Sequence, residues 1–138
     1  MNLNRPVWEI MTTDLVTVAD TDSIEEIKPL IERRGFHHLP VENNTGTIAG
    51  IISSEDFSRA AFFPVPEDKL LAKHIMTVSA EAIDMQTPLK KVVDKFLTKR
   101  FRALPIINED KILVGIVTPY DIMKVLMAHF KGEEISSI

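Results

Sequence analysis

Two short motifs in this chain place a hydroxyl residue three positions before an aspartate at the expected start of a helix, Ser53-x-x-Asp56 and Thr118-x-x-Asp121. The exposed N–H groups and positive dipole end of such a helix favour an anion, and a carboxylate accepts hydrogen bonds from hydroxyl groups. The same pattern is also a capping box in which Asp replaces the usual Glu or Gln. Ligand binding and helix capping both remain open explanations.

Other residue types give little support to metal binding or catalysis. The chain has no cysteine, His37 and His38 are adjacent, and His74 and His129 are distant in sequence. No His-x-x-x-His or carboxylate triad that would suit zinc is present. The chain also lacks a nucleophile elbow, a P-loop and a Rossmann glycine pattern. We therefore expect no metal site, no required cofactor and no enzymatic activity.

The two motifs belong to an internal repeat. Residues 10–58 align without a gap on residues 75–123 at an offset of 65, and ten of these 49 positions are identical. Other positions exchange similar residues, so the apolar pattern is kept as well. A unit of about 50 residues buries too little surface to be stable alone, so we expect two similar units that share one core.

Each repeat shows the pattern of a strand, a helix, a hairpin and a second helix. In the first repeat, residues 15–18 and 39–41 have strand character, and residues 48–52 resume it after a turn-rich segment. The second helix is expected to begin near Ser53 in the first copy and near Thr118 in the second. The predicted fold class is α+β, with β-α-β-β-α twice, packed with pseudo-two-fold symmetry into one module.

These elements divide the 138 residues into a first repeat at 7–61, a connector at 62–71, a second repeat at 72–130 and a polar tail at 131–138. In the connector, Phe62 and Phe63 are expected to pack against the module. This division assigns the whole chain to a single two-repeat module.

Charge and composition limit the partners. The net charge is −4, from 16 Lys and Arg against 20 Asp and Glu, which argues against nucleic acid as the main partner and against an anionic membrane surface. No apolar run approaches the ~20 residues of a membrane span, and the first residues lack a signal-peptide pattern. We expect a cytoplasmic protein without a membrane partner.

Three motifs occur in both repeats: an Ile-Met-Thr opening, a Leu-Pro-Val/Ile strand start, and a closing Gly followed by two apolar residues and Ser/Thr-x-x-Asp. They lie at Trp8–Thr12 and His74–Thr77, at Phe36–Val41 and Phe101–Ile106, and at Gly50–Asp56 and Gly115–Asp121. This pattern resembles the CBS domain family. Two copies in register, covering nearly the whole chain, resemble a stand-alone CBS pair, or Bateman module, of the acetoin-utilisation-like type.

The resemblance implies roles for particular residues. Asp56 and Asp121 would accept hydrogen bonds from the ribose hydroxyls of an adenine nucleotide, while Ser53, Thr118 and the helix starts would face phosphate. Main-chain groups of His38 and Ala103 would read the polar edge of the base. The residues that would line the base or form the opposite wall of the pocket are Pro40, Val41, Pro105, Ile106, Thr17, Val18, Ala82 and Ile83.

Arg102 and His37 occupy the position where the family commonly has a basic residue, and they are candidates for phosphate contacts. Cations near helix C-termini also explain such residues without a ligand. Between the two sites, the second is expected to bind phosphate better, because Ser54-Glu55 places an acid where the second copy has Pro119-Tyr120.

The resemblance implies a non-catalytic regulatory module. It would bind AMP, ADP, ATP or another adenosyl ligand between its repeats and signal to a regulated protein that the sequence does not identify. A homodimer is expected, since one pair of small repeats does not cover all of its apolar helical stripes. The alternative is a ligand-free dimerising scaffold.

Overall fold

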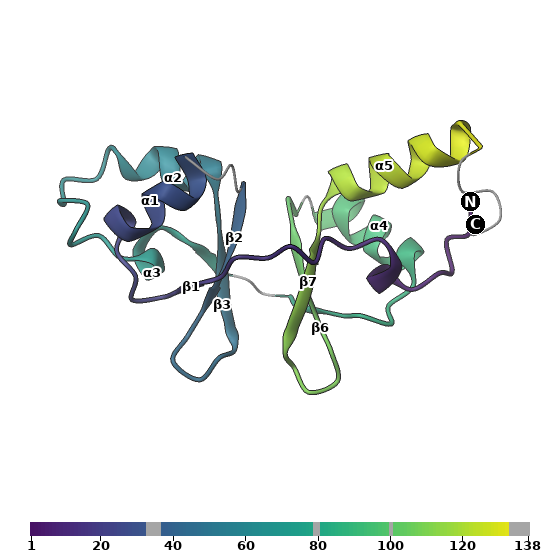
Figure 1. The fold of residues 1–138 in the computed structure, drawn as a ribbon, viewed down its shortest axis with the longest axis horizontal. Coiled ribbons are helices and arrows are strands. Elements are labelled where there is room, and N and C mark those ends of the chain that lie inside the picture. Colours follow the sequence, from purple (N-terminus) through teal and green to yellow (C-terminus); the bar gives the residue numbers. More distant parts are fainter. Residues whose placement is uncertain (33–36, 79–80, 100, 133–138) are drawn as a thin grey trace. The chain divides into compact units, whose positions relative to one another are not determined.

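The computed structural model describes residues 1–32, 37–78, 81–99 and 101–132. Gly35 and Phe36, and residues 133–138 of the expected tail, lie outside the described residues. The chain forms two compact units. We call residues 15–80 the N-repeat unit, and residues 1–14 together with 81–138 the C-repeat unit. In Figure 1 the purple N-terminal segment accordingly runs with the green and yellow elements of the second repeat.

The N-repeat unit is a four-stranded sheet with helices packed against it. Its strands lie in the order β1 (Val18–Ala19), β2 (His38–Glu42), β3 (Ile48–Ser53) and β4 (Thr77–Val78). β1 is parallel to β2, and the other neighbours are antiparallel. The helices are α1 (Ile24–Glu32), α2 (Ser54–Ala60) and the short α3 (Ala72–Ile75). Its core joins buried residues of α1, β2, β3 and α3.

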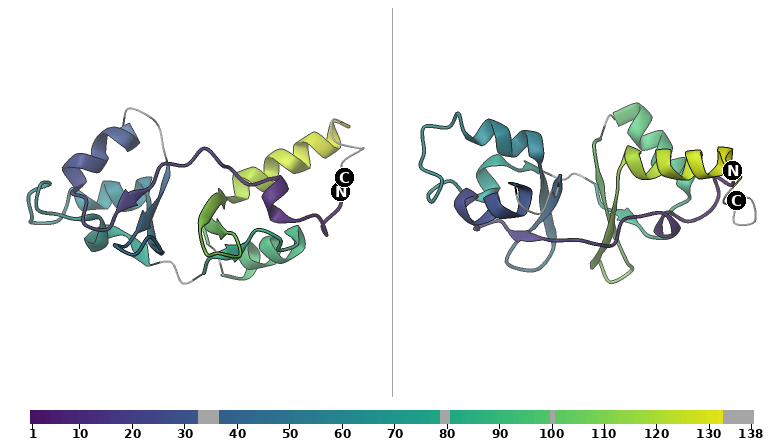
Figure 2. Two further views of the ribbon diagram at one scale, coloured as in Figure 1. Left: turned by 60° about the horizontal axis from the view of Figure 1, so that its bottom comes forward. Right: turned by 45° about the horizontal axis from the view of Figure 1, so that its top comes forward.

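The C-repeat unit repeats this arrangement. Its sheet has the order β5 (Ile83–Asp84), β6 (Leu104–Ile107) and β7 (Leu113–Val117), and its helices are α4 (Leu89–Lys99), α5 (Pro119–Phe130) and a short 3₁₀ helix, η1 (Val7–Glu9). The core contains Val7, Val92, Leu104 and Val117. Within each unit, the long helices pack beside the hairpin (Figure 2). The predicted α+β fold with two β-α-β-β-α repeats is confirmed, but each unit has a core of its own, so the expectation of one shared core is wrong.

Strand register agrees between the repeats, as the fixed sequence offset requires. Val18 pairs with Val41 in the first copy, and Ile83 pairs with Ile106 in the second. The hairpin pairs Leu39–Ile52 and Leu104–Val117 also correspond. Both hairpins carry an irregularity at the same place, directly after Val41 and after Ile106.

The two repeats exchange their opening segments. The Val7 N–H donates to the Thr87 carbonyl at 2.9 Å, and the equivalent Ala72 N–H donates to the Asp22 carbonyl at 2.8 Å. Farther along, Thr12 pairs with Ile116 of β7, just as Thr77 pairs with Ile51 of β3. Each unit therefore contains the Ile-Met-Thr segment of the other repeat.

This exchange explains why the closing motif begins with glycine. A Cβ added to Gly115 would collide with the Met11 side chain, and one added to Gly50 would lie 2.5 Å from the Thr77 carbonyl oxygen and 2.9 Å from the Met76 Sδ. The methionine and glycine positions of the repeat therefore face each other across the exchanged segment.

One expectation for the connector is wrong. Phe62 is 88% exposed, so it does not pack against the module as predicted, and Phe63 is 42% exposed. All residues from Ala61 to Lys69 are exposed, so the connector itself does not cover the Phe62 ring.

Candidate functional site

Asp121 lies at the third residue of α5, at the end of β7. The Thr118 N–H donates to Asp121 Oδ2 at 2.9 Å, and the Asp121 N–H donates to Thr118 Oγ1 at 3.4 Å. These reciprocal bonds form the predicted capping box, and Pro119 occupies the first helical position, where its missing N–H costs nothing. The carboxylate is only 3% exposed.

Capping uses one oxygen of Asp121, while the other has different partners. Asp121 Oδ1 accepts a hydrogen bond from the Thr12 hydroxyl at 2.9 Å, and the Lys124 ammonium lies 3.5 Å from the same oxygen. The second contact crosses one helical turn, and the first comes from the exchanged opening segment. The carboxylate therefore makes more contacts than a cap requires.

Asp56 has the equivalent environment in the N-repeat unit. The Ser53 N–H donates to Asp56 Oδ2 at 2.9 Å, and the Asp56 N–H donates to Ser53 Oγ at 3.1 Å. Arg59 pairs with Oδ1, and the Thr77 hydroxyl lies 3.4 Å from Oδ2. Asp56 is 5% exposed. Both buried carboxylates thus belong to a capping box, lie near a cationic side chain and are contacted by a threonine of the exchanged segment.

The structure gathers half of the predicted site residues in each unit. The N-repeat unit contains Thr17, Val18, His37, His38, Pro40, Val41, Ser53 and Asp56, and the C-repeat unit contains Ala82, Ile83, Arg102, Ala103, Pro105, Ile106, Thr118 and Asp121. Strand pairing brings members of each set together. His38 lies opposite Ser53 in the hairpin, and the His37 carbonyl accepts a hydrogen bond from the Ser54 N–H at 2.9 Å.

The predicted wall residues divide by burial. Val18, Val41, Ile83 and Ile106 are 5% exposed or less and belong to the cores of their units, and Pro40 and Pro105 are also buried. These residues therefore form the cores of their units, and their contact with a ligand stays a prediction. By contrast, the predicted residues that lie one or two positions before a strand are exposed at four sites, namely Thr17, Ala82, His37 and Arg102.

Thr12 and Thr77 contact the two aspartates, and they were not among the site residues predicted from the sequence. Their identity at equivalent positions of the repeat was visible, but the sequence did not show that each would lie against the aspartate of the other repeat. The indication that the sequence offered was a threonine directly after a methionine in both copies, at Met11-Thr12 and Met76-Thr77.

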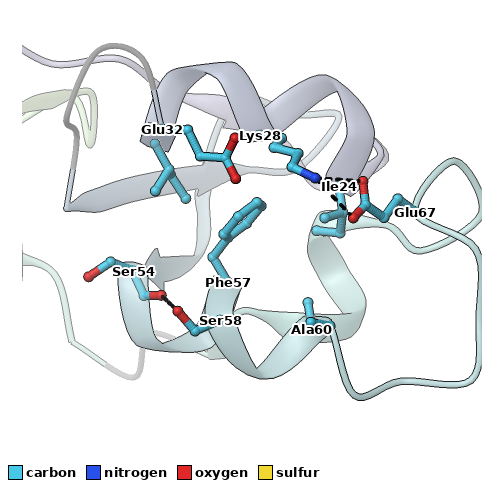
Figure 3. A pocket seen from close by; sticks show the side chains of 10 residues that line it. Ile24, Lys28, Glu32, Ser54, Phe57, Ser58, Ala60 and Glu67 are labelled. Carbon is cyan, nitrogen blue, oxygen red and sulfur yellow. Dashed lines mark hydrogen bonds and ion pairs between the residues drawn. The ribbon is translucent and has the colours of Figure 1, made fainter.

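A pocket of about 400 Å³ lies between α1 and α2 of the N-repeat unit. Figure 3 shows Phe57 pointing into it and the Lys28–Glu67 ion pair, at 3.3 Å, at its edge. Among the described residues, those that line it include none of the predicted site residues. We assign no ligand to this pocket.

The described part of the chain contains no cluster of three or more His, Cys, Asp or Glu side chains arranged to hold a metal ion. Within those same residues, no helix is both long enough and apolar enough to cross a membrane.

The duplicated unit, with its capped aspartates and exchanged segments, defines a class of protein. The sequence profile of the CBS domain matches residues 7–62 and 72–128, so the chain belongs to the CBS domain family. It is 32% identical over 127 residues to a homoserine O-acetyltransferase of Methanosalsum zhilinae. The aligned region covers 91% of this chain and 25% of that protein. The chain spans about a quarter of the length of this relative and of two other curated relatives that it matches.

Solved structures of CBS pairs have the same fold. The CBS domain pair of protein MJ0100, in complex with 5′-methylthioadenosine and S-adenosyl-L-methionine, is similar with a TM-score of 0.76 and 25% identity, covering 90% of this chain and 97% of that one. The AcuB protein of Vibrio cholerae gives a TM-score of 0.78 at 22% identity, covering 94% of this chain and 95% of that one. The predicted resemblance to CBS pairs is confirmed.

Proposed function

We propose that this chain is a non-catalytic regulatory module that binds an adenine nucleotide (AMP, ADP or ATP) or another adenosyl ligand. The observation that carries the proposal is the duplicated buried aspartate, Asp56 or Asp121, at the start of a helix beside the first residues of a hairpin. The similar CBS pair of MJ0100 is bound to two adenosyl compounds, which supports this ligand class.

We propose the following roles for the predicted residues. Asp121 and Asp56 accept hydrogen bonds from ribose hydroxyls, and the N-termini of α5 and α2, with Thr118 and Ser53, face the anionic part of the ligand. Main-chain groups at His38 and Ala103 read the polar edge of the base, and the strand residues that follow them line it. Arg102 and His37 contact phosphate, where the guanidinium fork suits the anion better than an imidazole.

Regulation requires more than tight binding. A ligand shifts an equilibrium only when it binds one arrangement of the protein more strongly than another. We propose that an unidentified partner protein responds to this shift. In homoserine O-acetyltransferase relatives the matched region is about a quarter of the protein, which leaves most of their length for other activities.

Replacing Asp121 with alanine tests the proposal. Loss of charge-assisted hydrogen bonds to ribose, worth about 2 kcal/mol, lowers affinity for AMP or ATP roughly 30-fold. If Asp121 only caps α5, the same change lowers stability by about 1 kcal/mol and leaves ligand affinity unchanged. Calorimetric titration and a denaturant midpoint on one variant separate the two outcomes.

Asp56→Ala is the matched control, since the repeat places Asp56 identically but Glu55 adds an acid to the first turn of α2. A larger loss of affinity at Asp56 than at Asp121 contradicts the ranking of the two sites. Wild-type protein that binds no adenine nucleotide or adenosyl compound at millimolar concentration favours the ligand-free scaffold instead.

The proposal includes a homodimer. The solvent-exposed face of α5 carries Tyr120, Met123, Met127 and Phe130, which are 65%, 58%, 54% and 74% exposed. These residues recur at helical spacing, so they form one apolar stripe. Sedimentation at micromolar concentration is expected to show twice the 15.6 kDa chain mass, and Met127→Glu is expected to shift the protein toward monomer. A purely monomeric wild type contradicts this part of the proposal.

A further inference from the structure

The threonine of each exchanged segment lies on the carboxylate that the proposed function assigns to ribose. Thr12 Oγ1 donates to Asp121 Oδ1 at 2.9 Å, and these residues are 109 positions apart in the chain. In the N-repeat unit the Thr77 hydroxyl lies 3.4 Å from Asp56 Oδ2, the oxygen that also accepts the capping bond from the Ser53 N–H. A threonine of the exchanged segment thus reaches the aspartate in both units, and Thr12 contacts the oxygen that is not used in capping.

The acceptor positions of Asp121 are already in use. A carboxylate offers about four lone-pair positions. Oδ2 accepts from the Thr118 N–H at 2.9 Å and lies 3.3 Å from the Thr118 hydroxyl. Oδ1 faces the Thr12 hydroxyl and the Lys124 ammonium at 3.5 Å. Two vicinal ribose hydroxyls need acceptor positions of their own.

These contacts differ in how readily they can be replaced. The Thr118 N–H belongs to the capping box, and its loss would leave a helix start without its cap. Lys124 is 57% exposed, and its contact is long. The Thr12 hydroxyl is neutral and supplies the same kind of O–H donor as a ribose hydroxyl, so a ribose hydroxyl replaces it without changing the charge around the carboxylate.

Thr12 also attaches the exchanged segment to the C-repeat unit. Its N–H donates to the Ile116 carbonyl at 2.8 Å, and the Ile116 N–H donates to the Thr12 carbonyl at 3.0 Å. Two residues later, at Asp14, the N-terminal segment of the C-repeat unit ends, and the chain continues into the N-repeat unit. The Thr12 hydroxyl therefore lies at the last attachment of the segment before the chain passes to the other unit.

We infer that Thr12 and Thr77 compete with the ligand for Asp121 and Asp56, so that ligand binding at each aspartate loosens the exchanged segment of the other repeat. This inference rests on the proposed function. It makes Thr12 and Thr77 affinity-setting residues, and it gives adenosyl binding a direct mechanical consequence on the chain that links the units. By thermodynamic linkage, a protein whose exchanged segment is held more weakly must bind the ligand more strongly.

The test compares Thr12→Val, which removes the hydroxyl and keeps the shape of the side chain, with Thr12→Ser, which keeps the hydroxyl. AMP and S-adenosylmethionine serve as probes in calorimetric titrations. We expect Thr12→Val to bind the better probe about fivefold more tightly than wild type, and Thr12→Ser to bind like wild type. A purely structural role lowers the unfolding midpoint of Thr12→Val without raising its affinity.

Amide hydrogen exchange on the wild type provides a readout that needs no variant. Saturating probe is expected to speed exchange of the Thr12 and Ile116 amides, whose bonds close the exchanged segment onto β7. If wild type binds a probe but these amides do not change and Thr12→Val binds equally or more weakly, competition is wrong and the proposed function stands. If wild type binds neither probe, the proposed function fails and the inference fails with it. Should Thr12→Val not fold, Thr77→Val and the wild-type exchange decide.

Discussion

The two units have the same backbone arrangement around the aspartate but different neighbouring side chains. Asp56 pairs with Arg59 and shares the first turn of α2 with Glu55, whereas Asp121 lies near Lys124 and follows Pro119, with no second acid in that turn. The capping bonds of Ser53 and Thr118 to their aspartates have the same length, 2.9 Å. The fold thus fixes the position of the carboxylate, and the neighbouring residues set the charge that a ligand meets.

The last helices of the repeats differ more. α2 has 7 residues and α5 has 12. At the position of Met123 on α5 the first repeat has Ser58, and at the position of Tyr120 it has Glu55. The hairpin register and the capping box correspond in the two units, so neither feature accounts for the greater length of α5.

The largest difference in stability between equivalent variants of the two units is expected at the glycine that faces the exchanged segment. Gly50→Ala places a Cβ 2.5 Å from the Thr77 carbonyl oxygen, and backbone cannot move aside as a side chain can, so we expect a loss of about 2–3 kcal/mol in unfolding free energy. In Gly115→Ala the new Cβ meets the flexible Met11 side chain, and about 1 kcal/mol is expected. Denaturant midpoints measure both. Equal losses would show that the two exchanged segments are held in the same way.

Removing the capping hydroxyls should have a smaller effect. Ser53→Ala and Thr118→Ala are each expected to lower stability by about 1 kcal/mol. The loss should be greater for Ser53, because the Asp56 N–H lies 3.1 Å from Ser53 Oγ, while the corresponding distance at Thr118 is 3.4 Å. Thermal or denaturant unfolding provides the comparison, with Ser53→Thr and Thr118→Ser as controls that keep the hydroxyl. The reverse ranking contradicts the distance argument.

The hairpin turns offer a milder comparison. Gly46 and Lys111 occupy the same repeat position with φ values of 82° and 64°. A side chain in this left-handed region is unfavourable by about 1 kcal/mol, and glycine avoids that cost. Lys111→Gly is therefore expected to raise the unfolding free energy by about 0.5–1 kcal/mol, and Gly46→Lys to lower it by a similar amount. No gain in Lys111→Gly would show that Lys111 has compensating contacts in its turn.

The charge in the first helical turn should give the smallest effect. Glu55→Gln is expected to raise the affinity of the N-repeat unit for ATP about two- to threefold at low salt, because an acid beside a bound phosphate is unfavourable. Tyr120→Glu places an acid at the equivalent position of α5 and should lower ATP affinity there. S-adenosylmethionine, which has no phosphate, serves as the control ligand. A change of equal size with both ligands would contradict the electrostatic explanation.

Local patterns in the sequence were sufficient for much of this structure. The capping boxes link residues three positions apart, so Ser53 with Asp56 and Thr118 with Asp121 were readable directly. The apolar periodicity and the fixed offset gave the order of elements in both repeats. Equal spacing in the two copies also implied the equal strand register that the hairpins show.

What the sequence determined by itself was the repeat, its elements and the location of both aspartates. Only the tertiary structure decided that Thr12 lies on Asp121 and Thr77 on Asp56, that Val41 and Ile106 point into the cores, and that Phe62 stays in solvent. Capping bonds form within one helical turn, so spacing records them. Contacts between segments as far apart as 109 residues depend on how the strands close around each core, and no local spacing records that.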